Sequence, residues 1–281
     1  PKLSSLSSPR ELTIAEFFCW IHRIMKKNDM PNKNKFITVI PARMNSIRLT
    51  NKPMKIIAGE PMIIHVWKRA VAANLGPVLV ACDNDSILKA IQKEGGTALL
   101  TDSNLPSGSD RIFEALCEFD PDETYRRIIN LQGDLPDIPI NYLTLLANML
   151  CQDKFDLCTL VAPCKKDEIN APQVVKAVMS WKSEYSNSDF TIGRAHYFSR
   201  APIPFGSDIF WHHIGVYGWK RDALKRFVES SPSDLEQTEK LEQLRALELG
   251  MTIGAGRVDK PAAGIDTCLL YTSPSPRDGI G

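Results

Sequence analysis

Short apolar runs alternate with amphipathic segments over the first 160 residues, and this alternation constrains the fold more than any other feature of the chain. The apolar runs that we expect to form strands are 36–40, 77–82, 97–100, 127–132 and 156–162. Between them lie segments with the apolar spacing of helices, namely 61–74, 84–94, 108–119 and 140–151. Alternating strands and helices are typical of a parallel, doubly wound sheet, so the sequence predicts an α/β fold.

The regular alternation ends near residue 174. The expected strands beyond it are 174–179, 195–198, 213–217 and 252–258, with helices expected only at 220–229 and 234–249. The stretch 174–218 is therefore rich in strands that no helix connects. We expect an antiparallel excursion or a small subdomain there.

Two helix starts have a clear sequence signal. Ser107 followed by Asp110 resembles a capping box and predicts a helix beginning near Gly108. Ser233 followed by Glu236 predicts the start of the last helix in the same way. A glycine at position 250 predicts its end.

Composition excludes several classes of protein. The 281 residues are 43% hydrophobic and 24% charged, as in ordinary globular enzymes, and the formal net charge of +1 argues against a nucleic-acid partner. No run approaches the eighteen or so apolar residues of a membrane helix, so we expect no membrane partner. The seven cysteines form no CxxC pair, and most lie in apolar runs. We interpret them as reduced core residues of a cytoplasmic protein.

A basic loop follows the first expected strand. The segment IPARMNSIRLTNKP, residues 40–53, contains Arg43, Arg48 and Lys52 but no glycine. Loops at the C-terminal ends of strands are where α/β sheets bind ligands. Arginine forks and a lysine charge suit phosphate groups, so the loop predicts a polyphosphate site rather than an ordinary solvated loop.

Two aspartates are candidate metal ligands. Asp134 follows the expected strand 127–132 in IINLQGDLP, and Asp266 follows the last strand in AGIDT. A turn or helix-capping role is the common interpretation of such a residue taken alone. Beside a polyphosphate loop we favour Mg²⁺ binding, because Mg²⁺ is normally held by one or two carboxylates together with phosphate oxygens.

The segment ACDND, residues 81–85, is a competing metal motif. Asp-x-Asp after a strand marks many sugar transferases, but here a helical pattern follows directly. We therefore predict that Asp83 or Asp85 caps that helix.

Seven motifs in order resemble one family. They are IPARMNSIRLTNKP, SGSDR, NLQGD, YFSRAPIP, HHIGVYGW, LEQLRALELG and GIDT, spread from Phe36 to Thr267. The chain resembles 3-deoxy-manno-octulosonate (Kdo) cytidylyltransferases, the CMP-Kdo synthetases of bacterial lipopolysaccharide synthesis. The resemblance implies a three-layer αβα, nucleotide-diphospho-sugar transferase-like (Rossmann-like) mixed sheet with a small antiparallel excursion. It also implies Mg²⁺ as cofactor, CTP and Kdo as substrates, and a homodimer.

The resemblance also assigns roles to residues. Arg43, Lys52 and Asp134 correspond to catalytic positions, and Asp134 and Asp266 to metal ligands. The nucleotide would be bound by Ala42, Arg43, Lys52, Ser107, Gly108 and Gln132. The sugar would be bound by Arg200, His213, Tyr217, Glu242 and Gln243.

The ends of the chain depart from the family pattern. After Asp266 the family continues TPED into a terminal helix, whereas this chain reads TCLLYTSPSPRDGIG. We expect 1–34 to be an extension outside the core, 35–267 to be the cytidylyltransferase domain, and 268–281 to be a non-native tail.

The expected reaction is transfer of CMP from CTP to the anomeric hydroxyl of Kdo with release of pyrophosphate. One alternative is a cytidylyltransferase for another acid sugar, of the sialic acid type. The other is a catalytically impaired nucleotide-binding protein, which the altered C-terminus favours. Release of pyrophosphate in the presence of each sugar separates all three.

Overall fold

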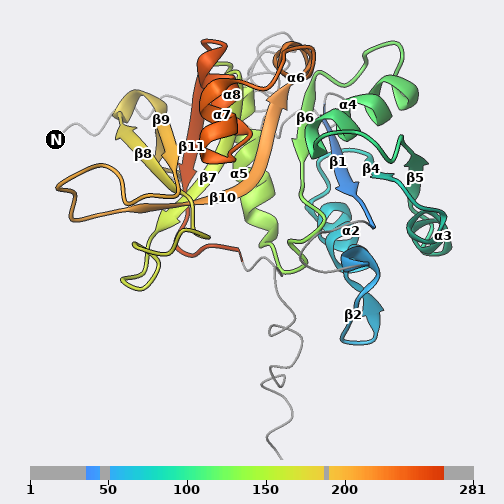
Figure 1. Ribbon diagram of the computed structural model, residues 1–281. Helices are drawn as coiled ribbons and strands as arrows, with labels where there is room; N and C mark the ends of the chain where they lie inside the picture. Colours follow the sequence, from blue (N-terminus) through green and yellow to red (C-terminus); the bar gives the residue numbers. More distant parts are fainter. Residues whose placement is uncertain (1–35, 45–50, 187–189, 263–281) are drawn as a thin grey trace, which may run out of the picture.

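One nine-stranded sheet runs through the described part of the chain, which comprises residues 36–44, 51–186 and 190–262 of the computed structural model. The strand order is β5–β4–β1–β6–β10–β7–β11–β9–β8 (Figure 1). The strands are β1 (Phe36–Ala42), β4 (Val78–Cys82), β5 (Thr97–Leu100), β6 (Arg127–Asn130), β7 (Leu157–Pro163), β8 (Lys176–Trp181), β9 (Ile192–Ser199), β10 (Trp211–Lys220) and β11 (Ile253–Arg257). A separate two-stranded ribbon pairs β2 (Ile56–Ile57) with β3 (Glu60–Pro61).

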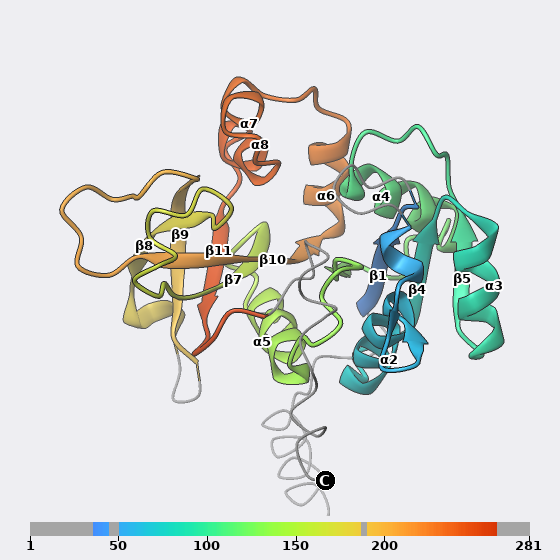
Figure 2. The ribbon, with the colours of Figure 1, turned by 60° about the horizontal axis from the view of Figure 1, so that its bottom comes forward.

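Helices pack on both faces of this sheet (Figures 1 and 2). One apolar core contains side chains of α2 (Met62–Ala73), α3 (Asp85–Lys93) and α5 (Ile140–Cys151). The other contains side chains of α4 (Gly108–Phe119), α6 (Arg221–Val228) and α8 (Gln243–Glu248). The other helices in the described part of the chain are α7 (Asp234–Glu239) and two 3₁₀ turns, η2 (Lys52–Met54) and η3 (Ser183–Tyr185). None of the described helices combines the length and the apolar character needed to cross a bilayer.

The run FITVI forms a central strand because it is apolar on both sides. Phe36 and Ile40 belong to the core beneath α2 and α5, whereas Ile37 and Val39 belong to the core beneath α4. Every residue of β1 is buried. A strand with both faces covered reads as a continuous apolar run, as parallel sheets require.

The parallel half of the sheet is confirmed. β5, β4, β1 and β6 all pair in parallel. The antiparallel excursion is confirmed as well: β8 pairs with β9, and β9 pairs with β11, both antiparallel. These strands extend the same sheet rather than forming a separate unit. β10 is also antiparallel to its neighbours, and it joins the two halves by pairing with both β6 and β7.

The expected helix 234–249 is two helices. The capping box of Ser233 and Glu236 starts α7, as predicted. Lys240 then adopts a left-handed conformation with φ of 59°, which ends α7, and α8 begins three residues later. The sequence does not predict this break, because the apolar spacing continues across it and lysine is not a residue type that favours positive φ. At the C-terminal end the prediction holds, since Gly250 has a φ of 73° just after α8.

The cap of α3 is also different from the prediction. Asn84, rather than Asp83 or Asp85, is the N-cap residue, and its side chain accepts the Ser86 N–H at 2.8 Å. Asp85 lies in the first turn of the helix. Asp83 points elsewhere, toward the loop after β1, where it accepts the Met44 N–H at 2.9 Å.

The cysteines are only partly in the core. Cys82 and Cys158 are buried in strands, as expected, and burial raises the pKa of both thiols. Cys117 and Cys151, by contrast, are exposed on α4 and α5, so the interpretation as core residues is wrong for these two. Both helices have an exposed face, which an apolar run alone does not reveal.

Gly254 in β11 lies against the ring of Phe155, so a substitution there tests how tightly this part of the core is packed. A Cβ at this position would lie 2.5 Å from Cδ2 and 2.7 Å from Cγ of the Phe155 ring. We predict that Gly254→Ala lowers the free energy of unfolding by about 1–3 kcal/mol through overpacking. Gly215→Ala in β10 is the matched control, because a Cβ at that position would meet nothing within 4 Å. Thermal unfolding that is equally affected in both variants would contradict this packing account.

Candidate active site

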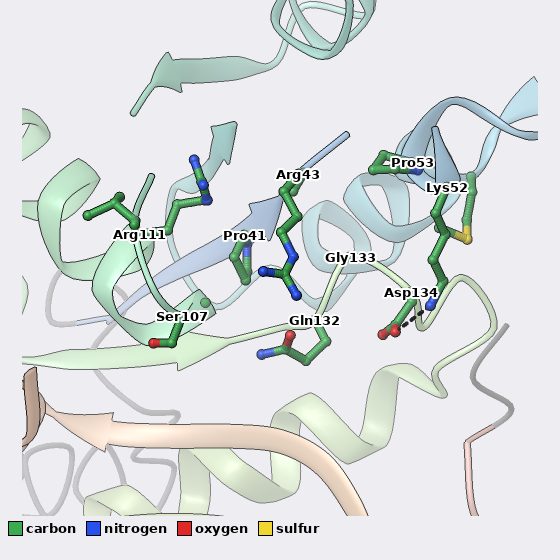
Figure 3. A pocket seen from close by; sticks show the side chains of 13 residues that line it. Pro41, Arg43, Lys52, Pro53, Ser107, Arg111, Gln132, Gly133 and Asp134 are labelled. Atoms are coloured by element: carbon green, nitrogen blue, oxygen red, sulfur yellow. Dashed lines mark hydrogen bonds and ion pairs between the residues drawn. The ribbon is translucent and has the colours of Figure 1, made fainter. Parts of the chain in front are cut away.

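A pocket of about 290 Å³ opens where β1 and β6 end (Figure 3). The two strands pair in parallel, with Val39 opposite Asn130, so the residues that follow them meet at one edge of the sheet. The pocket is lined from these two strand ends, from the start of α4 and from η2. This edge is where open α/β sheets bind their ligands.

The structure brings together all the described residues that were predicted to bind nucleotide or metal. The pocket is lined by Ala42, Arg43, Lys52, Ser107, Gly108, Gln132 and Asp134. Figure 3 shows the Arg43 and Gln132 side chains near the middle, with Ser107 on one side and the Lys52–Asp134 pair on the other. Arg48 and Asp266 lie outside the described residues, so their predicted roles have no structural account.

Lys52 and Asp134 form an ion pair in the pocket. Lys52 Nζ donates to Asp134 Oδ2 at 2.8 Å, joining residues that are 82 positions apart. The side chains are 13% and 36% exposed, respectively. The pair therefore presents both a cation and a carboxylate to a ligand in the pocket, each held in place by the other.

A hydrogen bond to Asn130 orients the Gln132 side chain. Its Nε2 donates to the buried Asn130 Oδ1 at 2.9 Å. This bond fixes the direction of the amide, so that Oε1 faces the first turn of α4. A fixed amide is suited to reading the hydrogen-bonding edge of a base.

Gly133 is a glycine because two backbones approach closely there. A Cβ at this position would lie 2.9 Å from the Pro41 carbonyl oxygen, a backbone atom that cannot move aside easily. The close approach lets the loop after β6 cross the end of β1. It thereby brings Asp134 to the basic residues of the neighbouring loop.

Arg111 is a pocket residue to which the sequence analysis gave no role, and Asp83 is its partner. Arg111 lines the pocket, is almost fully buried, donates to Thr101 Oγ1 and lies 4.0 Å from the Asp83 carboxylate. Since Asp83 also accepts the Met44 N–H, this group anchors the chain directly after Arg43. The motif SGSDR includes Arg111, but nothing in it indicates the contact with a strand end 28 residues earlier.

His213 is a buried neutral histidine. It is 8% exposed, its Nε2 lies 3.0 Å from Thr159 Oγ1, and its ring packs on Phe198 and Tyr217 at centroid distances of 4.9 and 5.6 Å. Burial lowers the pKa of His213 to about 3. Burial likewise raises the pKa of Tyr217, so both groups are uncharged near neutral pH.

Glu242 and Gln243 lie at the start of α8. Glu242 Oε1 is 2.7 Å from Ser107 Oγ, which places it beside the nucleotide pocket, and burial raises the pKa of its carboxyl group. Gln243 is 5% exposed, and within the described part of the chain its Nε2 has no hydrogen-bond partner. A buried amide donor without a partner is costly, so a bound polar ligand would stabilise it.

Arg200 contacts the protein backbone. Its Nε donates to Glu239 O at 3.1 Å, and its Nη1 and Nη2 donate to the carbonyls of Pro172 and Lys240 at 3.0 and 3.4 Å. Three of its five N–H donors are thus engaged, which leaves two for a ligand. None of the five predicted sugar residues is among the described residues that line the 290 Å³ pocket.

A divalent cation fits the chemistry of the pocket. The Asp134 carboxylate supplies a hard oxygen at the surface of the pocket. Across residues 36–44, 51–186 and 190–262, no group of three or more His, Cys, Asp or Glu side chains is placed to hold a metal ion. Mg²⁺ suits such a site, because it normally keeps several waters and uses few protein ligands with substrate phosphates.

Comparisons with known proteins show what the chain is similar to. The family model described as cytidylyltransferase matches residues 37–253. Two proteins called 3-deoxy-manno-octulosonate cytidylyltransferase, from Paramagnetospirillum magneticum and Methylobacterium nodulans, are 46% and 47% identical over 232 residues, which is 82% of this chain and 92% of each relative. A solved structure of CMP:2-keto-3-deoxy-manno-octonic acid synthetase complexed with CTP superposes with a TM-score of 0.74 at 34% identity, covering 84% of this chain and 95% of that one. A cytidylyltransferase from Leptospira borgpetersenii, 14% identical with a TM-score of 0.51, shares the fold.

The buried neutral His213 predicts an acid-sensitive fold. In the unfolded chain its pKa returns to about 6.5, so between pH 6.5 and 3 the unfolded state binds a proton that the folded state does not. Stability is therefore lost as the pH falls through this window, by about 1.4 kcal/mol at pH 5.5 relative to pH 7.5. When the pH falls from 7.5 to 5.5, the free energy of unfolding of His213→Gln, measured with denaturant, should decrease by about 1.4 kcal/mol less than that of the unaltered protein.

His196→Gln on β9 is the control for this measurement, because His196 is exposed and bonds to Ser180 at 2.7 Å. It should lose stability with acid as the unaltered protein does. An identical acid dependence in the His213 variant and the unaltered chain would contradict the assignment of a buried neutral imidazole.

Proposed function

The chain belongs to the 3-deoxy-manno-octulosonate cytidylyltransferase family, and on this premise we propose that it transfers CMP from CTP to Kdo for lipopolysaccharide biosynthesis. The observation that carries the proposal is the convergence of the predicted nucleotide residues on one pocket. In the reaction the anomeric oxygen of Kdo attacks the α-phosphorus of CTP. A new O–P bond forms, the bond to pyrophosphate breaks, and the hydroxyl proton is released.

Arg43 and Lys52 bind the triphosphate in this proposal. Arginine and lysine neutralise charge that develops on the transferring phosphoryl group and on the leaving pyrophosphate. Lys52 is already held near the pocket wall by Asp134, so little ordering is needed when the ligand arrives. Alignment and charge neutralisation are the main contributions that an enzyme makes to this class of reaction.

Ser107, Gly108 and Gln132 recognise the cytosine, and Ala42 contacts the nucleotide through its backbone. The orientation of Gln132 by Asn130 supports this role, because a fixed amide presents a donor or an acceptor to a base edge. Gly108 supports it too, since a side chain there would meet Pro41 and Gln132 at 3.5 and 3.8 Å and fill the space between them.

Mg²⁺ is the proposed cofactor, held by Asp134 and Asp266 together with phosphate oxygens. When bound, the ion supplies positive charge to the triphosphate and orients it. Asp134 is the part of this ligand set that the described residues contain, and its carboxylate faces the pocket. Lys52 competes for the same carboxylate in the absence of a ligand.

The sugar is proposed to bind beside Glu242, where the two substrate sites adjoin. Gln243 supports this location, because its buried Nε2 has no partner among the described residues and a sugar hydroxyl can satisfy it. His213 and Tyr217 form an aromatic wall on β10. Arg200 has two N–H donors left for the carboxylate of the acid sugar.

Several further assignments belong to this proposal. The αβα, nucleotide-diphospho-sugar transferase-like fold is supported by apolar cores on both faces of the mixed sheet. Residues 35–267 are the cytidylyltransferase domain, with 1–34 and 268–281 outside it, and the protein works in the cytoplasm.

A homodimer is supported by the loop before β10, where Phe205 is fully exposed and Ile209 is 57% exposed. Light scattering that gives the mass of a single chain would overturn the dimer.

Release of pyrophosphate tests the function directly. The protein is mixed with Mg²⁺, one of four nucleoside triphosphates, and either Kdo or a sialic acid. We expect release with CTP and Kdo. Release with CTP and a sialic acid alone would identify a cytidylyltransferase for the other acid sugar. Binding of CTP without release in any mixture would identify a catalytically impaired protein.

Asp134→Asn tests the metal ligand. A neutral amide is a poor Mg²⁺ ligand, so kcat should fall by a factor of about one hundred or more while the fold is retained. Asp137→Asn, three residues further on, is the matched control, because its exposed carboxylate pairs with Arg69 outside this pocket. A kcat near normal for Asp134→Asn at saturating Mg²⁺ would refute the assignment.

Lys52→Ala tests the triphosphate contact. We expect a higher KM for CTP and a lower kcat, since a cation near the phosphates is lost at both stages. Lys55→Ala should change neither constant appreciably, because Lys55 is exposed and does not line the pocket. Equal effects in the two variants would mean that the loop acts only as a diffuse basic patch.

A further inference from the structure

Glu242 joins the two sets of substrate residues. Its Oε1 lies 2.7 Å from the Oγ of Ser107, although the two residues are 135 positions apart in the chain. Ser107 lines the nucleotide pocket, whereas Glu242 belongs to the predicted sugar set. We propose that Glu242 is a positioning residue for CTP, acting through the Ser107 hydroxyl before any sugar is bound. This inference rests on the proposed function, because it takes CTP as the ligand of the pocket.

The Ser107 hydroxyl is surrounded by carboxyl groups. Its Oγ lies 2.6 Å from Asp110 Oδ2 as well as 2.7 Å from Glu242 Oε1. A hydroxyl carries one hydrogen and can donate it to only one of them. The second short contact therefore needs a proton from a carboxyl group.

The Glu242 carboxyl group can hold such a proton. It lies at the start of α8, and burial raises its pKa. Asp110 lies in the first turn of α4, and its backbone N–H also bonds to Ser107 Oγ, at 3.2 Å. The Ser107 hydroxyl therefore bridges the two carboxyl groups, and Glu242 is its partner from outside α4.

This arrangement fixes Ser107 as the cap of α4. Ser107 Oγ accepts the N–H groups of Ser109 and Asp110 at 3.1 and 3.2 Å, which places the first turn of the helix against the pocket. Without Glu242 the hydroxyl keeps, among the residues that the structure describes, only its partners within α4. Its rotamer, and with it the pocket wall at Gly108, is then less restricted.

Arg245 holds α8 in position from one side. Its Nε and Nη2 donate to the two carboxylate oxygens of Glu236 in α7, both at 2.7 Å. Its Nη1 donates to the carbonyls of Phe227 and Ser230 at the end of α6 and just beyond it, both at 3.2 Å. One buried guanidinium thus joins α6, α7 and α8.

Arg200 holds the junction between α7 and α8 from the other side. Its guanidinium donates to the carbonyls of Glu239 and Lys240, and its backbone N–H donates to Glu239 Oε2 at 3.2 Å. Lys240 is the left-handed residue at which the chain turns toward Glu242. The carboxyl group is therefore presented to Ser107 by a junction that is tied at both ends, so its contribution to CTP binding is preorganised.

Isothermal titration with CTP and Mg²⁺, in the absence of Kdo, tests the proposal. Glu242→Ala and Ser107→Ala should each raise the Kd for CTP about three- to tenfold, the usual effect of losing one hydrogen bond. The double variant should bind no more weakly than Ser107→Ala, because Glu242 acts through Ser107. Glu242→Gln, which keeps a donor, should stay within about twofold of the unaltered protein.

Two further variants keep the test decisive. Glu242→Met retains the side-chain volume without a hydrogen bond, and it replaces Glu242→Ala if that variant fails to fold. Glu229→Ala, at the exposed C-terminal end of α6, is the control and should leave the Kd unchanged. An unchanged Kd in Glu242→Met, or effects of Glu242 and Ser107 that add in the double variant, would overturn the proposal.

The unaltered protein separates this inference from the proposed function. If it releases pyrophosphate from CTP and Kdo while Glu242→Met binds CTP normally and only its KM for Kdo rises, Glu242 is solely a sugar ligand and the inference alone fails. If the unaltered protein does not bind CTP, the proposed function fails as well.

Discussion

The parallel pairing of β1 with β6 is the constraint on which the rest of the site depends. It sets Val39 opposite Asn130, so both strands end at the same edge of the sheet. The glycine at position 133 then lets one strand end pass close to the other, where a Cβ would lie 2.9 Å from the Pro41 carbonyl oxygen. At this edge Lys52 pairs with Asp134, although the two residues are 82 positions apart in sequence.

A second group of polar contacts ties the antiparallel half of the sheet to this pocket. Arg200 follows β9 and holds the turn after α7, while Glu242 after that turn reaches Ser107 at the start of α4. Apolar packing alone would tolerate small shifts of α7 and α8. Directional hydrogen bonds restrict such shifts, because each bond weakens when its distance and angle change.

Arg43, Lys52 and Asp134 could be predicted from local pattern, whereas the roles of Ala42, Ser107, Gly108 and Gln132 came from the family resemblance. A buried strand followed by Arg43, and another followed by Asp134, suffice to place both at one sheet edge. Contacts between distant segments could not be predicted. Asp83 contacts Met44 and Arg111, and Asn84 rather than Asp83 or Asp85 caps α3. Lys240 adopts a left-handed conformation, which divides a continuous apolar repeat into two helices. The motifs identified which residues would bind the sugar, but they did not predict the contacts of those residues, such as the backbone carbonyls that Arg200 binds.

A crystal structure of the protein with CTP and Mg²⁺ tests the central claim most directly, namely that the ends of β1 and β6 form the nucleotide site. The account predicts the triphosphate against Arg43 and Lys52, the ion on Asp134, and the cytosine between Gln132 and the first turn of α4. Density for the nucleotide at any other surface, with the Lys52–Asp134 pair unchanged, would contradict it.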